Sequence, residues 1–316
     1  MRLLIAFLAT LLTAGAAHGA TEIAPRVHLI LGGFTPGSQP DGNSTVIDAR
    51  GGLIVIDSGR HAAHTQAIVD FARSLRKPVK AVINTHWHLD HIGGNAMLRR
   101  EFPGVRIYAS NAFSAARTGF LARYRKQLEE MIAATPDAEA QKSFRTEMAL
   151  VDAGDQLAPD EVLTRSREMK IAGRRLRIGV VSHAATASDI TVTDVATKVL
   201  IAGDLVTLPA PFLDTACPKG WRDALDALAK SDFTIVVPGH GAPMTRSELE
   251  AYRSAFGALL TCAEAEGAKD RCVDGWVTSL SPLLPSGEQD FTRMLTSYYV
   301  DLLRGDPSRI EQLCVD

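Results

Sequence analysis

Three histidines and an aspartate lie within six residues of this chain, at His86, His88, Asp90 and His91. Imidazole and carboxylate groups are the ligands that Zn²⁺ and related transition metals prefer. In an extended backbone, His86 and His88 lie on one side of the chain and His91 on the other, so one short loop can serve two adjacent metal positions. A chance cluster and a histidine-rich tract are the alternatives, but the surrounding residues are not of low complexity. The spacing therefore predicts a metal site.

Short apolar runs that alternate with amphipathic stretches must position this loop. The run 79–84 is a predicted strand that leads directly into it. Other predicted strands are 27–31, 44–48, 53–57, 105–109, 175–181, 190–193, 199–202 and 234–237. Predicted helices are 62–75, 95–102, 221–229, 247–260 and 291–303. Two runs of strands with interleaved helices favour a layered α/β fold. We expect His61 and His64, near the start of a helix, to face solvent.

The segment 120–150 has a long helical pattern that Thr135 and Pro136 interrupt. One apolar stripe at helical spacing consists of Leu121, Tyr124, Leu128, Met131 and Ile132. Packing of this stripe on the body of the domain is the favoured interpretation. A helical lid over a pocket is the alternative.

The N-terminus has the pattern of an export signal. Met1 and Arg2 form a short positive region, residues 3–12 are almost wholly apolar, and residues 14–20 are mostly small. We therefore predict a signal peptide at residues 1–20, cleavage near Gly19 or Ala20, and a periplasmic or secreted location. An uncleaved anchor is the alternative, but the apolar run is short for a bilayer. No later run approaches 18 apolar residues, so we expect no stable membrane insertion after cleavage.

Four cysteines fit an oxidising compartment, which permits two disulfides in any of three pairings. The preferred pairing joins Cys262 to Cys272 across a short polar loop, and Cys217 to Cys314 at the C-terminal tail. A cysteine metal site is the alternative, but no Cys-x-x-Cys spacing occurs.

Composition bounds the function classes. The chain has 316 residues, of which 46% are apolar and 22% charged, with a formal net charge of −2. This is globular composition and does not favour a nucleic-acid partner, so we expect a small-molecule substrate. No Gly-x-Ser-x-Gly occurs, and no Gly-x-Gly-x-x-Gly follows a strand. The sequence offers no prediction of oligomeric state.

The motif His86-x-His88-x-Asp90-His91 after a strand resembles the signature of the metallo-β-lactamase-fold hydrolases. The likeness extends over residues 27–253 through Asp57 after an apolar run, Ala202-Gly-Asp204 and Pro238-Gly-His240-Gly. It implies a four-layer αββα sandwich with metals at one edge between two sheets. We expect this domain at residues 21–260, and a helical extension packed on it at 261–316.

The resemblance also implies a set of metal ligands. His86 and His88 would bind a first metal, Asp90, His91 and His240 a second, and Asp204 would bridge both. A hydroxide between the metals would attack the substrate, and Asp90 is the candidate catalytic residue that steers or relays the proton of the water. Zn²⁺ is expected from the ligand types, with two ions favoured over one; iron and manganese are the alternatives.

The third ligand of the first metal departs from the family pattern. If Thr186 and Asp189 set the register, Ala185 occupies the ligand position. His183 lies two residues earlier, on the same face of an extended chain, and a rearranged loop would deliver it as the ligand. The alternative is that His183 has a supporting role and that the first metal is weakly bound.

The resemblance favours an exported metal-dependent hydrolase, with zinc as the expected metal, that cleaves an ester, lactone, thioester or amide bond. Asp204 is typical of the dinuclear glyoxalase II and lactonase-like branches rather than of dedicated β-lactamases. A β-lactam-hydrolysing enzyme remains an alternative. The other is a non-catalytic metal-binding or partner-binding protein on a decayed hydrolase scaffold, which Ala185 supports and the intact ligands oppose.

Overall fold

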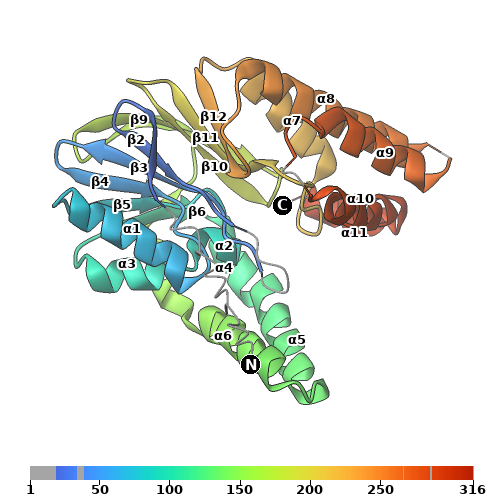
Figure 1. Cartoon of the computed structure of the whole chain (residues 1–316), viewed down its shortest axis with the longest axis horizontal. Coiled ribbons are helices and arrows are strands. Elements are labelled where there is room, and N and C mark those ends of the chain that lie inside the picture. Colours follow the sequence, from blue (N-terminus) through green and yellow to red (C-terminus); the bar gives the residue numbers. More distant parts are fainter. Residues whose placement is uncertain (1–18, 34–38, 266, 285–286, 316) are drawn as a thin grey trace, which may run out of the picture.

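A computed structural model describes residues 19–33, 39–265, 267–284 and 287–315 (Figure 1). The predicted signal peptide lies outside the described residues, apart from its last two positions. In the described part of the chain, two stacked sheets carry helices on their outer faces, which is the predicted αββα sandwich. None of the described helices is long and apolar enough to span a membrane.

The first sheet has seven strands among the described residues, in the order β1 to β7. They are β1 (Thr21–Ala24), β2 (Val27–Ile30), β3 (Ser44–Ala49), β4 (Gly52–Ile56), β5 (Val79–Ile83), β6 (Arg106–Ser110) and β7 (Glu161–Leu163). Strands β4 to β7 are parallel, and every residue of β4 is buried because both faces of the sheet are covered. Helices α1 (Ala62–Ser74) and α3 (Asn95–Glu101) cover the outer face.

The second sheet has five strands within the described segments, in the order β12-β11-β10-β9-β8. They are β8 (Arg167–Ile171), β9 (Arg174–Ser182), β10 (Ser188–Asp194), β11 (Val199–Thr207) and β12 (Ile235–His240). All nine residues of β11 are buried. Helices α7 (Pro218–Ala229) and α8 (Arg246–Glu264) cover its outer face, where the Trp221 and Phe256 rings pack 5.1 Å apart. The inner faces of the two sheets share an aliphatic core that includes Ile54, Ile83 and Ile190.

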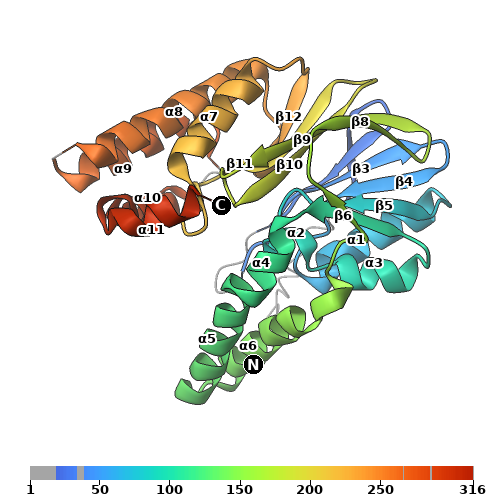
Figure 2. The ribbon, with the colours of Figure 1, turned by 180° about the vertical axis from the view of Figure 1, so that it is seen from behind.

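A helical hairpin projects from the first sheet (Figures 1 and 2). It follows α2 (Leu89–Ile92) and α4 (Ala112–Thr118), and consists of α5 (Phe120–Ala134) and α6 (Ala138–Asp152), with the 3-10 turn η1 (Gly154–Gln156) after it. Leu121 and Tyr124 of the predicted stripe belong to the same apolar cluster as Trp87 and Leu89, as packing on the body of the domain requires. Leu128 is also buried, whereas Met131 is 43% exposed, so the prediction does not hold for the whole stripe. The first turns of α5 also form a wall of the cavity described below.

The C-terminal helices pack beside α8 (Figure 2). They are α9 (Lys269–Leu280), α10 (Gln289–Arg304) and α11 (Pro307–Leu313). Trp276 and Tyr299 join the core formed by α7 and α8, and α8 itself runs through the predicted boundary at residue 260. Both predicted disulfides are present, Cys262–Cys272 between α8 and α9, and Cys217–Cys314 at the start of α7.

Candidate metal centre and active site

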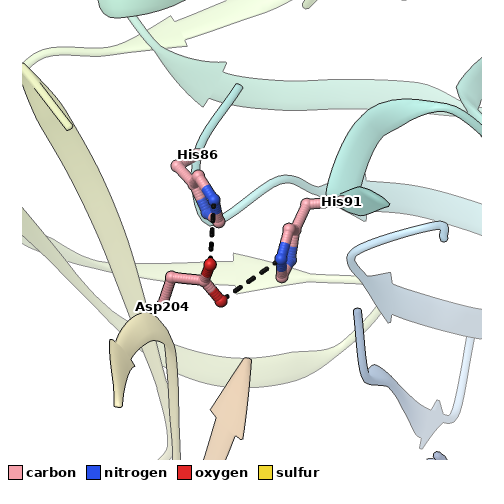
Figure 3. A group of neighbouring side chains, drawn as sticks. All are labelled: His86, His91 and Asp204. Atoms are coloured by element: carbon pink, nitrogen blue, oxygen red, sulfur yellow. Dashed lines mark ion pairs between the residues drawn. The ribbon is translucent and has the colours of Figure 1, made fainter. Parts of the chain in front are cut away.

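Asp204 and His240 lie on strands β11 and β12, His86 and His88 lie in the loop after β5, and Asp90 and His91 lie on α2. Figure 3 shows His86, His91 and Asp204 facing one another. Asp57, directly after β4, holds that loop in place and is buried. It accepts hydrogen bonds from the Thr85 backbone N–H and hydroxyl, both at 2.7 Å, and from His91 Nδ1 at 2.8 Å. Its φ of 60° is in the left-handed region, which aspartate tolerates better than most residues. Asp57 therefore orients two parts of the loop at once.

Neighbouring hydroxyl groups fix which nitrogens of His86 and His88 carry protons. The Thr85 hydroxyl donates to Asp57, so it accepts from His86 Nδ1, 3.0 Å away. The Thr215 hydroxyl donates to the carbonyl oxygen of residue 185 at 3.1 Å, so it accepts from His88 Nε2, 3.0 Å away. Both rings then turn an unprotonated nitrogen inward, and His86 Nε2 and His88 Nδ1 face each other at 2.9 Å. Two imidazole lone pairs at this distance repel each other unless a cation binds both.

A second group lies beside the first. His240 Nε2 is 3.0 Å from Asp90 Oδ2 and 3.4 Å from His91 Nε2. Asp204 lies between the groups, with Oδ2 3.7 Å from His86 Nε2 and Oδ1 3.3 Å from His91 Nε2. The ligand atoms of His86, His91 and Asp204 lie within 4.8 Å of one another, as do those of Asp90, His91 and His240. His91 belongs to both groups, and Asp204 Oδ1 also lies 3.6 Å from His240 Nε2, so Asp204 is close to ligands of both groups and its bridging role stays a prediction.

Burial and the neighbouring charges together determine the pKa values of the residues in this cluster. Burial lowers the pKa of His88 to about 4 and, with the neighbouring histidines, lowers the pKa of His86 well below its usual value. Burial alone would also lower the pKa of His91, but the surrounding aspartates raise it well above its usual value. Burial would raise the pKa of Asp90 and Asp204, but His91 and the other histidines hold both well below the usual range. The carboxylates are therefore ionised, and a divalent cation would supply the positive charge that they attract.

These residues fit a pair of divalent cations. Among the described residues, no donor makes a well-aligned hydrogen bond to the buried Asp204 Oδ1. Two glycines leave room around the ligands: a Cβ at Gly239 would lie 1.9 Å from Asp204 Oδ1, and one at Gly42 would lie 2.5 Å from His91 Cε1. The inward lone pairs, the carboxylate oxygen without a well-aligned donor and the mixed nitrogen and oxygen donors fit a divalent cation such as Zn²⁺.

His183 is the predicted ligand that the structure does not bring into either group. Its ring lies beside the C-terminal helices, with Nδ1 3.4 Å from the Leu313 carbonyl oxygen. Ala185 is buried, and its carbonyl oxygen accepts the hydrogen bond from Thr215. Among the described residues, the first group therefore has His86, His88 and Asp204 as its candidate ligands.

Arg60 is a site residue for which the sequence gave no signal. Its Nη2 lies 3.7 Å from Asp90 Oδ1, and its Nη1 pairs with the buried Glu147 of α6. Glu147 also accepts a hydrogen bond from the Tyr124 hydroxyl at 3.3 Å. No local motif marks this chain of contacts, because Arg60 and Glu147 are 87 positions apart. The pair connects the hairpin α5–α6 to the metal centre.

A cavity of about 1020 Å³ opens onto the cluster. His88, Asp90, Asp204 and His240 lie on its surface. The aromatic part of its lining comes from four regions of the chain and includes Trp87, Phe120, Tyr124, Phe212, Phe291 and Tyr299. A large concave site with apolar walls and a few polar groups at one place is typical of a small-molecule site. Trp221, in contrast to Trp87, is a core residue.

Comparisons with known proteins agree with this geometry. The model of the metallo-β-lactamase superfamily matches residues 38–240. A linear primary-alkylsulfatase from Pseudomonas sp. (strain ATCC 19151) is 27% identical over 226 residues, which are 64% of this chain and 42% of the relative. A hydroxyacylglutathione hydrolase from Gloeobacter violaceus is 41% identical over 58 residues, 16% of this chain and 23% of the relative. The chain thus spans less than half the length of these curated relatives.

Solved structures show the same fold. A metallo-β-lactamase from Pontibacter korlensis superposes with a TM-score of 0.57 at 22% identity, over 75% of this chain and 98% of that one. The superfamily match extends over more than half of the sequence and includes every candidate ligand of the two groups. The relatives named above are hydrolases. The chain therefore belongs to the metallo-β-lactamase superfamily.

Proposed function

We propose that the chain is an exported, zinc-dependent hydrolase that cleaves an ester, lactone, thioester or amide bond of a small molecule. The observation that carries this proposal is the 2.9 Å approach of His86 Nε2 and His88 Nδ1, with His88 on the surface of a large cavity. A decayed scaffold would have no reason to keep this arrangement. The two disulfides support the exported location, because such bonds persist in oxidising compartments.

Two ions and six ligands form the proposed centre. His86 and His88 would hold the first ion, Asp90, His91 and His240 the second, and Asp204 both. Bound zinc would lower the pKa of a water molecule and polarise the scissile bond. His183 stays a predicted ligand, although the position of its ring beside Leu313 opposes that role.

Asp90 is the proposed catalytic residue. It lies on the cavity surface, with one carboxylate oxygen toward His240 and the other toward Arg60. An ionised carboxylate in this position can orient an attacking water molecule and accept its proton. The Arg60 guanidinium favours the ionised form.

A sulfate ester is the second candidate substrate class. Arg60, Arg123 and Arg309 line the same cavity, and guanidinium groups bind anions well; Arg60 and Arg309 also pair with Glu147 and Asp214. The relative from Pseudomonas sp. (strain ATCC 19151) is named as a linear primary-alkylsulfatase. An alkyl sulfate would place its chain against the aromatic walls and its charged group near the arginines.

The test is a turnover panel with metal analysis. The purified protein, with its zinc content measured, is assayed with a p-nitrophenyl ester, an aryl lactone, an acyl thioester, a β-lactam and an alkyl sulfate. We expect Asp90→Asn to lower turnover of the preferred substrate by about 10²–10⁴-fold while the circular dichroism spectrum is unchanged. Asp232→Asn, at an exposed ion pair, is the matched control. Failure of the zinc-containing wild type to turn over any member of the panel would contradict the proposal.

A further inference from the structure

A threonine from the connection between β11 and α7 occupies the space beside His88. Thr215 is buried, and its hydroxyl lies 3.0 Å from His88 Nε2 while donating to the Ala185 carbonyl at 3.1 Å. We propose that Thr215 is the positioning residue that holds His88 as a metal ligand, in compensation for the alanine at position 185. This inference rests on the proposed zinc centre.

Proton counting gives the physical basis. A hydroxyl has one proton, and the Thr215 hydroxyl donates it to the Ala185 carbonyl oxygen. The hydroxyl can then only accept from His88, which fixes the proton of His88 on Nε2 and leaves the lone pair on Nδ1. It also fixes the rotation of the ring, so that Nδ1 faces His86 Nε2. Without the hydroxyl, a buried N–H would lack its partner and the ring could take either tautomer.

The connection that carries Thr215 is anchored by the C-terminal helices. The neighbouring Asp214 accepts hydrogen bonds from the Tyr298 hydroxyl at 2.8 Å and from Arg309 Nη2 at 3.0 Å. Two residues after Thr215, the Cys217 backbone N–H donates to the Ala184 carbonyl at 2.9 Å. The Cys217 side chain forms a disulfide with Cys314. Residues 214–217 are thus tied both to the C-terminal helices and to the strand connection that contains Ala185.

This arrangement gives the helical extension a role at the metal centre. A third ligand to the first ion would restrain that ion directly. Here the restraint acts through a hydrogen bond to His88, and partners of a ligating imidazole of this kind commonly change metal affinity 10–100-fold.

The experiment compares zinc affinity in three variants of the full-length protein. Zinc transfer to a chromogenic chelator is measured for wild type, Thr215→Val, Thr215→Ser and Thr292→Val, a control that removes a buried hydroxyl within α10. We expect Thr215→Val to bind the more weakly held of its two zinc ions about 10–100-fold less tightly than wild type does. Thr215→Ser keeps the hydroxyl and should stay within about threefold of wild type, as should Thr292→Val. If valine prevents folding, Thr215→Ala carries the same expectation.

Activity gives a second readout that a purely structural role would not produce. We expect kcat of dialysed Thr215→Val to fall and to recover on addition of Zn²⁺, with KM unchanged. Wild-type affinity in both Thr215→Val and Thr215→Ala, or a serine variant as weak as the valine variant, would overturn the inference. A wild-type protein that binds no zinc would instead refute the proposed function.

Discussion

At the scale of single residues, orientation by hydrogen bonds determines what the histidine cluster can bind. Asp57 contacts Thr85 and His91, and Thr85 in turn contacts His86, so one buried carboxylate influences both candidate metal positions. Most ligating histidines use their second nitrogen in this way, and loss of the partner weakens metal binding. Asp57 touches no candidate ligand atom, yet it is as important as a ligand for the geometry.

Replacement of Asp57 by asparagine tests that role. The amide offers only one acceptor oxygen, so His91 Nδ1 or Thr85 loses its partner. We expect zinc affinity to fall about 10–100-fold, measured by chelator competition. The fold is checked by circular dichroism, with Asp232→Asn as the control. Unchanged affinity in a folded Asp57→Asn variant would show that the carboxylate does not orient the ligands.

His183 provides a second prediction at this scale. Because its ring lies beside the Leu313 carbonyl oxygen rather than in the cluster, we expect His183→Ala to keep the zinc stoichiometry of wild type. Elemental analysis of the purified protein checks this. Loss of one ion per chain would instead show that the loop rearranges and delivers His183 as the third ligand.

At the scale of elements, the hairpin of β9 and β10 owes part of its stability to a buried ion pair. Arg174 at the start of β9 donates from Nε and Nη2 to the two carboxylate oxygens of Asp194, at 2.6 and 2.7 Å. Thr197, in the turn after β10, also donates to Asp194. Burial alone would raise the pKa of Asp194, but the hydrogen bonds from Arg174 and Thr197 lower it below its usual value of 3.8.

The lowered pKa of Asp194 predicts how the loss of unfolding free energy in Asp194→Asn depends on pH. An acid with a lower pKa in the folded state stabilises the fold above its unfolded pKa, and that stabilisation is lost as pH falls through the folded pKa. We expect the variant to lose about 1–3 kcal/mol of unfolding free energy near pH 7. The loss should shrink as pH falls below about 4. Urea unfolding at several pH values measures it, with the exposed Glu168→Gln as control, and a loss that grows in acid would contradict the assignment.

Strand β8 shows why an element can escape sequence analysis. It is an edge strand, and Arg167, Glu168 and Lys170 give it too few apolar side chains for a strand signal. Helix α9 lies within the predicted helical extension 261–316, although its bounds were not predicted; its Trp276 packs against Tyr252 of α8. His64 was predicted to face solvent and is instead buried, with Nε2 2.8 Å from Ser44 Oγ. In each case the deciding contact is not local.

At the scale of the whole molecule, two disulfides constrain very different lengths of chain. Cys217 and Cys314 are 97 positions apart, whereas Cys262 and Cys272 are 10 apart. The longer closed loop removes more conformational entropy from the unfolded chain. The Cys217–Cys314 disulfide also ties down the C-terminal helices that form one wall of the cavity.

We therefore expect unequal effects from removing the two bonds. Chain entropy predicts a loss of about 4.7 kcal/mol for Cys217→Ala with Cys314→Ala, and about 2.7 kcal/mol for Cys262→Ala with Cys272→Ala. Urea unfolding under non-reducing conditions compares the two double variants. Only the first pair should also raise KM, because α10 and α11 line the cavity. A larger stability loss for the short loop would contradict this account.

The sequence by itself determined the features that depend on neighbours along the chain. The strand 79–84 and the histidine spacing after it were readable because a strand that runs into a ligand loop is a local pattern. The same is true of Asp204 and His240, each at or near the end of a predicted strand. The preferred disulfide pairing is confirmed. It was predictable because one short loop joins Cys262 to Cys272, which leaves Cys217 and Cys314 for the second bond.

Only the tertiary structure decided which distant side chains meet these ligands. Thr215 reaches His88 across 127 positions, and Glu147 reaches Arg60 across 87. The ring of His183, two residues from the predicted ligand position, lies beside the C-terminal helices. Such contacts depend on how sheets and helices pack, and packing is set by the shape and burial of whole faces rather than by spacing in the sequence.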